Sequence, residues 1–467
     1  MKKSNQIVIS ALLLAALLVI AGVVWLLFGQ VLGGTDGNAE GKGMTIFNAK
    51  GEEMIIVKTP ADIYGSEYWA YLEIVVSEAQ EIIAQKENCK TQEAYDRLFA
   101  DGYQVYTAFD PVAYTALTMV SGGWGETCDT AAVITDLNGG LLAVNSSDVK
   151  GRQINYTQER RSPYSSFKAL SVYTPAIENE VVNWASMYED SPYKQLEDKD
   201  GQPQGWPANA SGTYSQADTT VYDALRKSLN TVAVKCLKDV GITKSMEFLR
   251  TNFGIPLKEE TYVVQAYGEE EVIGNIALGY LETGITPVEM AGYYQIFANG
   301  GVYTAPASIQ KICAADGADL YVREQSSKQV ISETTADLMN KLLQGVVADG
   351  GTGESAQVYD VEIAGKTGTG DNYADNWFVG VTPGYSIAVW HGQHSKNEAD
   401  DMFAAVIWEL YNAMPNANRK FITHKNLHQI VYCAHSGKAV SSACARIDIG
   451  YFNRMDALPV CDVCNKS

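Results

Sequence analysis

Residues 361–392, VEIAGKTGTGDNYADNWFVGVTPGYSIAVWHG, predict successive β-strands with a turn at a Pro-Gly pair. Two short apolar runs within residues 130–146, TAAVITDLNGGLLAVNS, flank an Asn-Gly-Gly turn that is typical of a β-hairpin. Helical periodicity predominates between these segments, most clearly over residues 221–254, where two helices are expected to end near Gly241 and Gly254. Strands at both ends of a helical region predict an α+β fold, in which helices sandwich an antiparallel sheet.

The composition is that of a chain that can build a large core. The protein has 467 residues, of which 46% are hydrophobic and 19% charged. This length corresponds to about three structural units. Lys and Arg number 35 against 55 Asp and Glu, which gives a net charge of −20. Because a basic surface supplies most of the affinity for nucleic acids, this charge argues against a nucleic-acid-binding protein.

The N-terminal region contains a candidate membrane anchor. Residues 7–28, IVISALLLAALLVIAGVVWLLF, carry no charge, and as a helix they span roughly 33 Å, enough to cross a bilayer core of about 30 Å. Lys2 and Lys3 precede this stretch, and such basic flanks stay in the cytoplasm. The sequence therefore predicts a single-pass protein of the cell membrane, with a cytoplasmic N-terminus and an extracytoplasmic main part.

Four of the eight cysteines lie near the C-terminus: Cys433, Cys444, Cys461 and Cys464. An extracytoplasmic location favours disulfides among them. The pair Cys461-Asp-Val-Cys464 has instead the spacing of half a zinc site, which the other two would complete. Disulfides, zinc and free thiols all remain open alternatives at this point. The remaining cysteines are expected as buried small hydrophobic residues: Cys89, Cys128, Cys236 and Cys313.

The segment RSPYSSFK at residues 161–168 contains a candidate nucleophile. Ser165 precedes Lys168 by three residues, so on a helix the two side chains share one face. A buried Lys168 that loses its proton can act as the base that a serine hydroxyl needs before it attacks a carbonyl. A histidine triad has little support, because the five histidines all lie within residues 391–435 and no Gly-x-Ser-x-Gly segment occurs.

Two further segments follow in an order that is characteristic of one enzyme group. KSLN supplies Ser228 and Asn230, and GKTGTG supplies a lysine and a short run of small residues: Lys366, Thr367, Gly368 and Thr369. Ser-x-x-Lys, a Ser-x-Asn element and Lys-Thr-Gly, in this order, occur in β-lactamases and penicillin-binding proteins.

The chain resembles the transpeptidase domain of class A penicillin-binding proteins over roughly residues 100 to 465. RSPYSSFK, SLNTVAV, ALGYLETGITPVEMAGYYQIFANGG and AGKTGTGDNYADNWFVGVTPGYSIAVWHG match the family in order and composition. The chain departs from the family pattern at Tyr164, where glycine is usual, and at Ala169 and Val232, where proline is common.

The resemblance implies a role for each motif residue. Ser165 is the implied nucleophile and Lys168 its base, Ser228 relays a proton to the leaving group, and Asn230 holds the substrate amide. Backbone N–H groups of Ser165 and Thr369 are the implied oxyanion hole.

The third motif is implied to bind the terminal carboxylate of the substrate. Lys366 supplies positive charge, and the substrate-binding residues are Thr367, Gly368 and Thr369. We expect no cofactor and no metal at this site. His391 and His394, which lie just past a predicted strand, are expected at the surface rather than as metal ligands.

The implied function is that of a D,D-transpeptidase, which cross-links peptidoglycan stem peptides ending in D-Ala-D-Ala through a serine acyl-enzyme and is a target of β-lactams. Two alternatives stay open: a D,D-carboxypeptidase or β-lactamase, in which water replaces the acceptor amine, and a non-catalytic penicillin-binding sensor or scaffold. A sensor needs a cytoplasmic output domain, for which residues 1–6 are too short.

The implied domain layout has four parts: a cytoplasmic stub and anchor at residues 1–33, a tether and linker at 34–122, the transpeptidase domain at 123–425 and a Cys-rich tail at 426–467. The glycosyltransferase signature of bifunctional relatives, Glu-Asp-x-x-Phe-x-x-His, does not occur. We therefore expect no glycan polymerisation, and a separate glycan polymerase as partner.

Overall fold

The computed structural model describes residues 41–257, 268–392, 396, 398–422, 427–455 and 458–464. The described residues from Gly43 onward form one compact unit. The anchor predicted at residues 7–28 lies outside the described residues. Within the described ranges, no helix combines the length and the apolar character that a membrane crossing requires.

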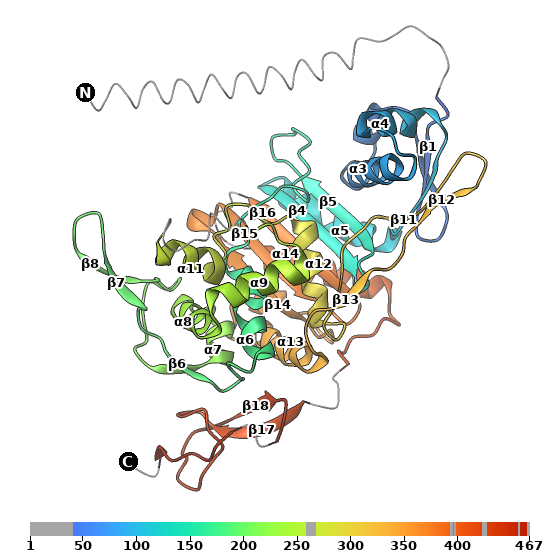
Figure 1. Ribbon diagram of the computed structural model, residues 1–467. Coiled ribbons are helices and arrows are strands. Elements are labelled where there is room, and N and C mark those ends of the chain that lie inside the picture. Colours follow the sequence, from blue (N-terminus) through green and yellow to red (C-terminus); the bar gives the residue numbers. More distant parts are fainter. Residues whose placement is uncertain are drawn as a thin grey trace, which may run out of the picture. The chain divides into compact units, whose positions relative to one another are not determined.

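A five-stranded antiparallel sheet lies at the centre of the fold (Figure 1). The strand order is β14-β15-β16-β4-β5. Because β16 pairs with β4, the predicted hairpin and the strands predicted at residues 361–392 belong to one sheet. This arrangement confirms the predicted α+β architecture. The strands are β4 (Asp129–Asp136), β5 (Leu141–Ser147), β14 (Ala364–Thr369), β15 (Asp375–Val381) and β16 (Tyr385–Gly392).

Helices cover both faces of this sheet, and the alternation of side chains along β15 shows which face is which. Phe378 contacts Phe403 of α14 with ring centroids 4.7 Å apart. Its neighbour Trp377 points to the opposite face, where its Nε1 donates a hydrogen bond to the Ser162 carbonyl at 3.0 Å. The helices packed on the sheet include α5 (Pro111–Gly125) and α14 (Ala399–Ala413) on the Phe378 side, and α12 (Pro287–Tyr294) on the Trp377 side.

Most helices between β5 and β14 form a layer on the Trp377 side, whereas the turn η5 (Glu354–Ala356) packs against α14 on the Phe378 side. As predicted, α8 ends before Gly241 and α9 before Gly254, whose φ of +66° is in the left-handed region. The other α-helices between β5 and β14 are α6 (Thr174–Glu178), α7 (Val221–Arg226), α8 (Asn230–Val240), α9 (Ile242–Phe253), α11 (Glu269–Leu278) and α13 (Glu333–Val347). The short helical turns are η1 (Tyr164–Phe167), η2 (Ala169–Tyr173), η4 (Gln295–Phe297), η5 (Glu354–Ala356) and η6 (Asp371–Tyr373).

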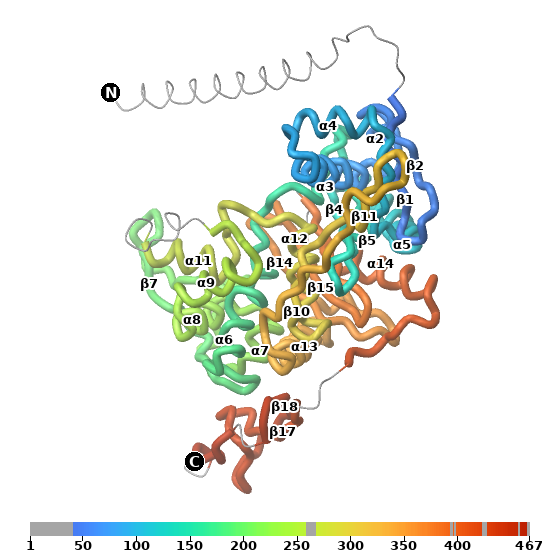
Figure 2. Tube along the Cα trace, turned by 45° about the vertical axis from the view of Figure 1, so that its right-hand side comes forward, coloured from blue at the N-terminus to red at the C-terminus, as the bar shows by residue number. Residues whose placement is uncertain are grey.

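A second sheet of five strands, in the order β12-β11-β3-β1-β2, packs with three N-terminal helices (Figure 2). Two of its strands come from residues 309–322, inside the segment predicted as the transpeptidase domain. The predicted domain boundaries themselves stay predictions. The elements are β1 (Met44–Phe47), β2 (Glu53–Val57), β3 (Gln104–Thr107), β11 (Ile309–Cys313), β12 (Asp319–Val322), α2 (Pro60–Tyr64), α3 (Trp69–Lys86) and α4 (Thr91–Ala100).

Four two-stranded ribbons complete the described part of the chain. The ribbon β17-β18 lies in the Cys-rich tail (Figure 1). The strands are β6 (Met187–Glu189), β7 (Lys194–Glu197), β8 (Pro203–Trp206), β9 (Asp218–Thr220), β10 (Val302–Thr304), β13 (Ser327–Gln329), β17 (His428–Cys433) and β18 (Ile447–Phe452).

Candidate active site

Ser165 lies in the 3₁₀ turn η1, which packs against the edge strand β14. The sequence predicted the start of a helix here, whereas the chain passes through η1 and a π-helical turn, η2, before α6 begins. Tyr164 enters η1 with a φ of +48°. This left-handed conformation favours glycine and is strained for tyrosine by about 1–3 kcal/mol. The geometry explains why glycine suits this position in the family pattern.

The two adjacent serines of η1 differ in exposure and in bonding. Ser166 is buried, and its hydroxyl donates a hydrogen bond to the Pro163 carbonyl at 2.6 Å. Ser165 is only partly buried. The hydroxyl of Ser166 therefore supports the turn, and Ser165 carries the hydroxyl that a substrate can reach.

Two glycines permit the close approach of other elements to η1. A Cβ added to Gly279, at the end of α11, would lie 2.2 Å from the Tyr164 carbonyl oxygen. A Cβ added to Gly368, on β14, would lie 2.5 Å from the Pro163 carbonyl oxygen. A side chain at either position would push η1 away, so the predicted substrate-binding residue Gly368 also has a structural role.

Lys168 is fully buried directly after η1 and points toward the second motif. Its Nζ donates to Asn230 Oδ1 at 2.6 Å and to the Ser228 carbonyl at 2.9 Å, and it lies 3.4 Å from Ser228 Oγ. Burial lowers the pKa of Lys168 well below its ordinary value, and the charge of Lys366 lowers it further. Both effects favour the neutral amine, which is the form that can accept a proton.

Lys366 approaches the same serine from β14. Its Nζ lies 3.0 Å from Ser228 Oγ and 3.1 Å from the Thr367 carbonyl. Burial lowers the pKa of Lys366 to about 7. The hydroxyl of Ser228 is thus in hydrogen-bond distance of two buried lysines from separate motifs. Ser228 itself has a φ of +56°, an unusual conformation for serine that is often found at functional sites.

Asn230 is held in place by a loop that the sequence analysis did not single out. Its backbone N–H donates to Asn209 Oδ1 at 2.9 Å, and its Nδ2 donates to the Ala208 carbonyl at 2.6 Å. Asn209 is buried and donates to Asp190 Oδ1 at 2.7 Å. Thr231 donates to the same carboxylate oxygen at 2.7 Å.

This network gives Asp190 a stabilising set of donors. Its carboxylate also accepts a hydrogen bond from the Ser215 backbone N–H at 2.8 Å. Burial works against its charge, but hydrogen bonds from Ser215, Thr231 and Asn209 outweigh burial and lower the pKa of Asp190. The charged carboxylate thus anchors Asn209, which in turn orients the start of α8.

The two predicted threonines lie at different depths on β14. Thr367 is buried, and its hydroxyl shares a hydrogen bond with that of Thr352 at 2.9 Å and lies 3.3 Å from Lys366 Nζ. Thr369 is exposed at the end of the strand. The structure therefore brings together Lys168, Ser228, Asn230 and Lys366 by hydrogen bonds, and it places Thr367 beside Lys366.

The expectation of a surface position for His391 is wrong. β16 continues to Gly392, so His391 is a strand residue, opposite Thr130 of β4, and is fully buried. Its Nε2 lies 3.2 Å from Met402 Sδ, and its ring stacks on Trp124 with centroids 6.2 Å apart. His394, the other predicted surface histidine, lies outside the described residues.

The sequence matches a known family and known relatives. The family described as "Penicillin binding protein transpeptidase domain" matches residues 130–405. Penicillin-binding protein 1A of Clostridium botulinum is 29% identical over 353 residues, which are 70% of this chain and 41% of the relative. Penicillin-binding protein 1A of Clostridium acetobutylicum is 34% identical over 264 residues, 55% of this chain and 31% of the relative. The chain thus spans less than half the length of these curated relatives.

Solved structures share the fold at low sequence identity. The D,D-transpeptidase domain of a peptidoglycan glycosyltransferase from Eggerthella lenta aligns with a TM-score of 0.62 and 18% identity, over 80% of this chain and 99% of that one. Penicillin-binding protein 1A from Haemophilus influenzae aligns with a TM-score of 0.64 and 18% identity, over 84% of this chain and 76% of that one. Because the family match covers more than half of the sequence, the chain belongs to the penicillin-binding protein transpeptidase family.

Proposed function

We propose that the protein is a membrane-anchored D,D-transpeptidase that cross-links peptidoglycan stem peptides through an acyl-enzyme on Ser165 and is a target of β-lactams. One observation carries this proposal: Ser228 Oγ lies 3.4 Å from Lys168 Nζ and 3.0 Å from Lys366 Nζ. Two buried lysines around one hydroxyl supply both a proton acceptor and a path for the proton to a leaving group.

Acylation begins when Ser165 Oγ attacks the carbonyl carbon of the penultimate D-Ala. Neutral Lys168 takes the hydroxyl proton, and the backbone N–H groups of Ser165 and Thr369 stabilise the oxyanion. The C–N bond then breaks as Ser228 gives its proton to the departing D-Ala nitrogen. Ser228 recovers a proton from Lys168, whose Nζ is within hydrogen-bond reach. The products are an ester on Ser165 and free D-Ala.

The terminal carboxylate of the donor peptide binds at β14. Lys366 in its charged form attracts the carboxylate, and the hydroxyls of Thr367 and Thr369 donate to it. Asn230 holds the amide of the donor peptide. In the second half of the reaction an acceptor amine attacks the ester carbonyl carbon, and Lys168 takes a proton from the amine. The bond between this carbon and Ser165 Oγ then breaks as Lys168 returns the proton to Ser165 Oγ, which restores the free hydroxyl and the neutral amine.

A product assay on the purified full chain tests this proposal. With a donor ending in D-Ala-D-Ala and an amine acceptor, we expect a cross-linked peptide in mass spectra, and its loss after preincubation with penicillin. Cleaved donor without cross-linked product would indicate a carboxypeptidase, rapid turnover of penicillin would indicate a β-lactamase, and binding of penicillin without any peptide product would indicate a sensor or scaffold.

The membrane location is part of the proposal and rests on the apolar residues 7–28. In host cells labelled with fluorescent penicillin, the labelled full chain should sediment with the membrane fraction. The lack of glycan polymerisation and the partnership with a separate polymerase stay predictions.

We predict that Asn209→Ala slows acylation of Ser165 by fluorescent penicillin about 10–100-fold. Asn209 fixes the backbone of Asn230, and a displacement of about 1 Å in a group that positions the substrate slows a reaction by roughly this factor. The rate constant at saturating penicillin should fall, whereas the pH dependence should keep its shape, since neither lysine is altered.

Asn179→Ala is the matched control. Its amide donates to the Pro175 carbonyl at the end of α6, away from the motif residues. If both variants are folded and Asn209→Ala is acylated as fast as Asn179→Ala, Asn209 does not position the catalytic residues.

A further inference from the structure

The four tail cysteines converge on one point. The Sγ atoms of Cys433, Cys444, Cys461 and Cys464 all lie within 4.8 Å of one another. The sulfurs of Cys433 and Cys464 are 3.6 Å apart, far beyond the bond length of about 2.05 Å in a disulfide. Four thiolates at about 2.3 Å from a tetrahedral zinc ion have their sulfurs about 3.8 Å apart. The spacing fits a metal site better than a pair of disulfides.

The backbone of the tail builds two turns that present these sulfurs. After Cys433 the chain reverses, with the N–H groups of Ser436 and Gly437 donating to the Cys433 carbonyl at 3.2 and 2.9 Å. A second turn brings in Cys444, whose backbone N–H donates to the Ser441 carbonyl at 3.1 Å. The backbone N–H of Cys461 donates to the Ala439 carbonyl at 2.8 Å, which joins the last segment of the tail to the segment between these turns. Cysteines distant in sequence therefore meet through main-chain hydrogen bonds, independently of any bond between sulfurs.

Several donors point at the sulfurs. Ser436 Oγ donates to Cys461 Sγ at 3.2 Å, and the Ser441 backbone N–H donates to Cys444 Sγ at 3.3 Å. Hydrogen bonds of this kind orient metal-bound sulfurs and stabilise their charge.

The tail has little apolar core of its own. Among its described residues, the buried nonpolar side chains besides Cys433 and Cys461 are Tyr432 and Phe452. A segment of this size rarely folds stably without a cross-link or a structural metal. Its hydrogen-bonded turns thus need a further constraint at the point where the four cysteines meet.

The tail packs against the segment that leads to the second catalytic motif. Gly437 and Gly450 allow this contact, because a Cβ on Gly437 would lie 2.0 Å from the Ala185 carbonyl and one on Gly450 would lie 2.5 Å from the Trp184 ring. Trp184 contacts Tyr451 of β18 at 5.3 Å between centroids and stacks on Tyr222 of α7 at 4.4 Å.

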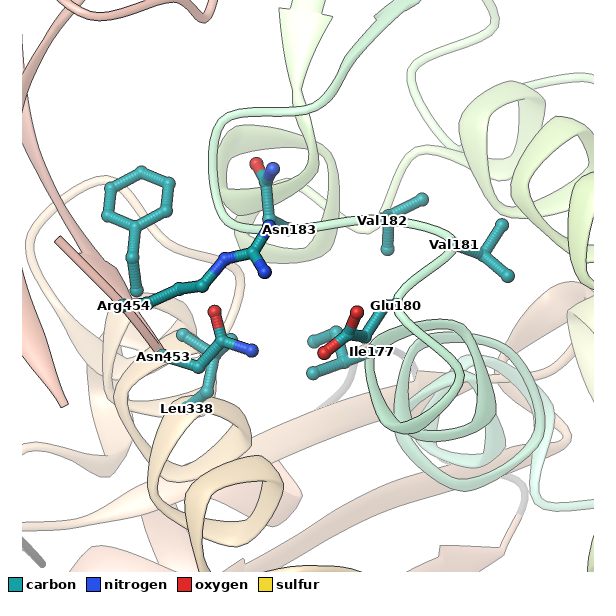
Figure 3. A pocket seen from close by; sticks show the side chains of 9 residues that line it. Ile177, Glu180, Val181, Val182, Asn183, Leu338, Asn453 and Arg454 are labelled. Carbon is teal, nitrogen blue, oxygen red and sulfur yellow. The ribbon is translucent and has the colours of Figure 1, made fainter. Parts of the chain in front are cut away.

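A small cavity marks the border of this contact (Figure 3). It has a volume of about 240 Å³ and is lined on one side by Asn453 and Arg454 of the tail, and on the other by residues such as Glu180 and Asn183. Its lining contains none of the motif residues, so we assign it no catalytic role.

We propose that Cys433, Cys444, Cys461 and Cys464 bind one zinc ion as a four-thiolate structural site that holds the tail hairpin in its packed position. Binding exchanges four thiol protons for one zinc ion, and no redox step is involved. All four positions are taken by protein sulfurs, as in closed structural sites, so the ion has no open position for catalysis. This proposal is independent of the proposed transpeptidase function.

Metal analysis and native mass spectrometry of the purified full chain test the site. We expect about one zinc per chain, bound without added metal and removed by a strong chelator after mild denaturation. Cys444→Ser and Cys461→Ser should each lose the zinc, whereas Cys89→Ser, a partly buried cysteine of the N-terminal region, should keep it.

Fluorescent penicillin provides the folding control, because the tail cysteines are not in the catalytic machinery. The cysteine variants should still be acylated at Ser165, while limited proteolysis should remove their tail faster than in the unaltered chain. Zinc retained by Cys461→Ser overturns the site. Three other results would also overturn the zinc site. One is an intact mass without zinc that is lower by two hydrogens per cysteine pair, which indicates disulfides. The others are stoichiometric iron in place of zinc, and a protease-resistant tail that has four free thiols and no metal.

Discussion

Replacing Ser165 by alanine is expected to abolish acylation by fluorescent penicillin, because no other hydroxyl in η1 is placed to attack. Ser165 is partly exposed and precedes the buried Lys168 by three residues. Without the nucleophile no covalent bond to penicillin can form at this site. The acylation rate should therefore fall by more than the roughly 10²–10⁴-fold expected for loss of a general base. No labelled band should be visible by gel fluorescence.

Ser166→Ala is the matched control, since it removes a hydroxyl one residue away. That hydroxyl donates to the Pro163 carbonyl, so its loss should lower the stability of the turn by about 1 kcal/mol. Most of the labelling should remain. Mass spectrometric mapping of the penicillin adduct to Ser166 rather than Ser165 would contradict the assignment.

The turn η1 shows which features of the site the sequence motifs predicted and which they did not. The motifs predicted a shared site, and Lys168, Ser228, Asn230 and Lys366 do lie within hydrogen-bond distance of common partners. Among the described residues, however, Lys168 Nζ bonds to Ser228 and Asn230 rather than to Ser165. Motif spacing did not predict the 3₁₀ and π-helical turns around Ser165. Their conformation depends on close contacts from Gly279 and Gly368, which are far away in sequence.

The support of Asn230 was not predictable for a related reason. Asp190 and Asn209 lie in irregular segments with short ribbons, where neither apolar periodicity nor a turn pattern distinguishes one polar residue from another. Their role depends on their burial and on the hydrogen bond of 2.7 Å that Asn209 donates to Asp190, neither of which a sequence pattern shows. Likewise, the sequence showed no sign that β11 pairs with the N-terminal strand β3, with β12 added at the edge, because such pairing depends on tertiary contacts.

Lys168→Ala is expected to suppress acylation by a soluble β-lactam about 10²–10⁴-fold at every pH from 6 to 9, because it deletes the proton acceptor itself. Lys366→Arg should retain a measurable fraction of the rate, since the positive charge survives although the geometry changes. The two lysines flank the hydroxyl of Ser228. The two substitutions are nevertheless expected to lower the acylation rate by different amounts and to change its pH dependence differently.

The pH dependence follows from the opposite forms that the two lysines must have. A lysine is charged below its pKa and neutral above it. Lys168 must be neutral, and its pKa is lowered by burial and by the charge of Lys366, so the rate should rise with pH through that lowered pKa. Lys366 must be charged, and burial lowers its pKa to about 7, so the rate should fall as pH rises above about 7.

The second-order rate constant of acylation, which reports the free enzyme, should therefore have a maximum near or below pH 7. At saturating β-lactam the bound carboxylate favours charged Lys366, which should move the alkaline limb to higher pH. In Lys366→Arg the alkaline limb should vanish below pH 9, because arginine does not lose its proton there. Since both side chains are fully buried, melting temperatures must accompany the rates to exclude unfolding. If folded Lys168→Ala were acylated as fast as Lys366→Arg, or if Lys366→Arg kept the alkaline limb, the division of roles between the two lysines would be wrong.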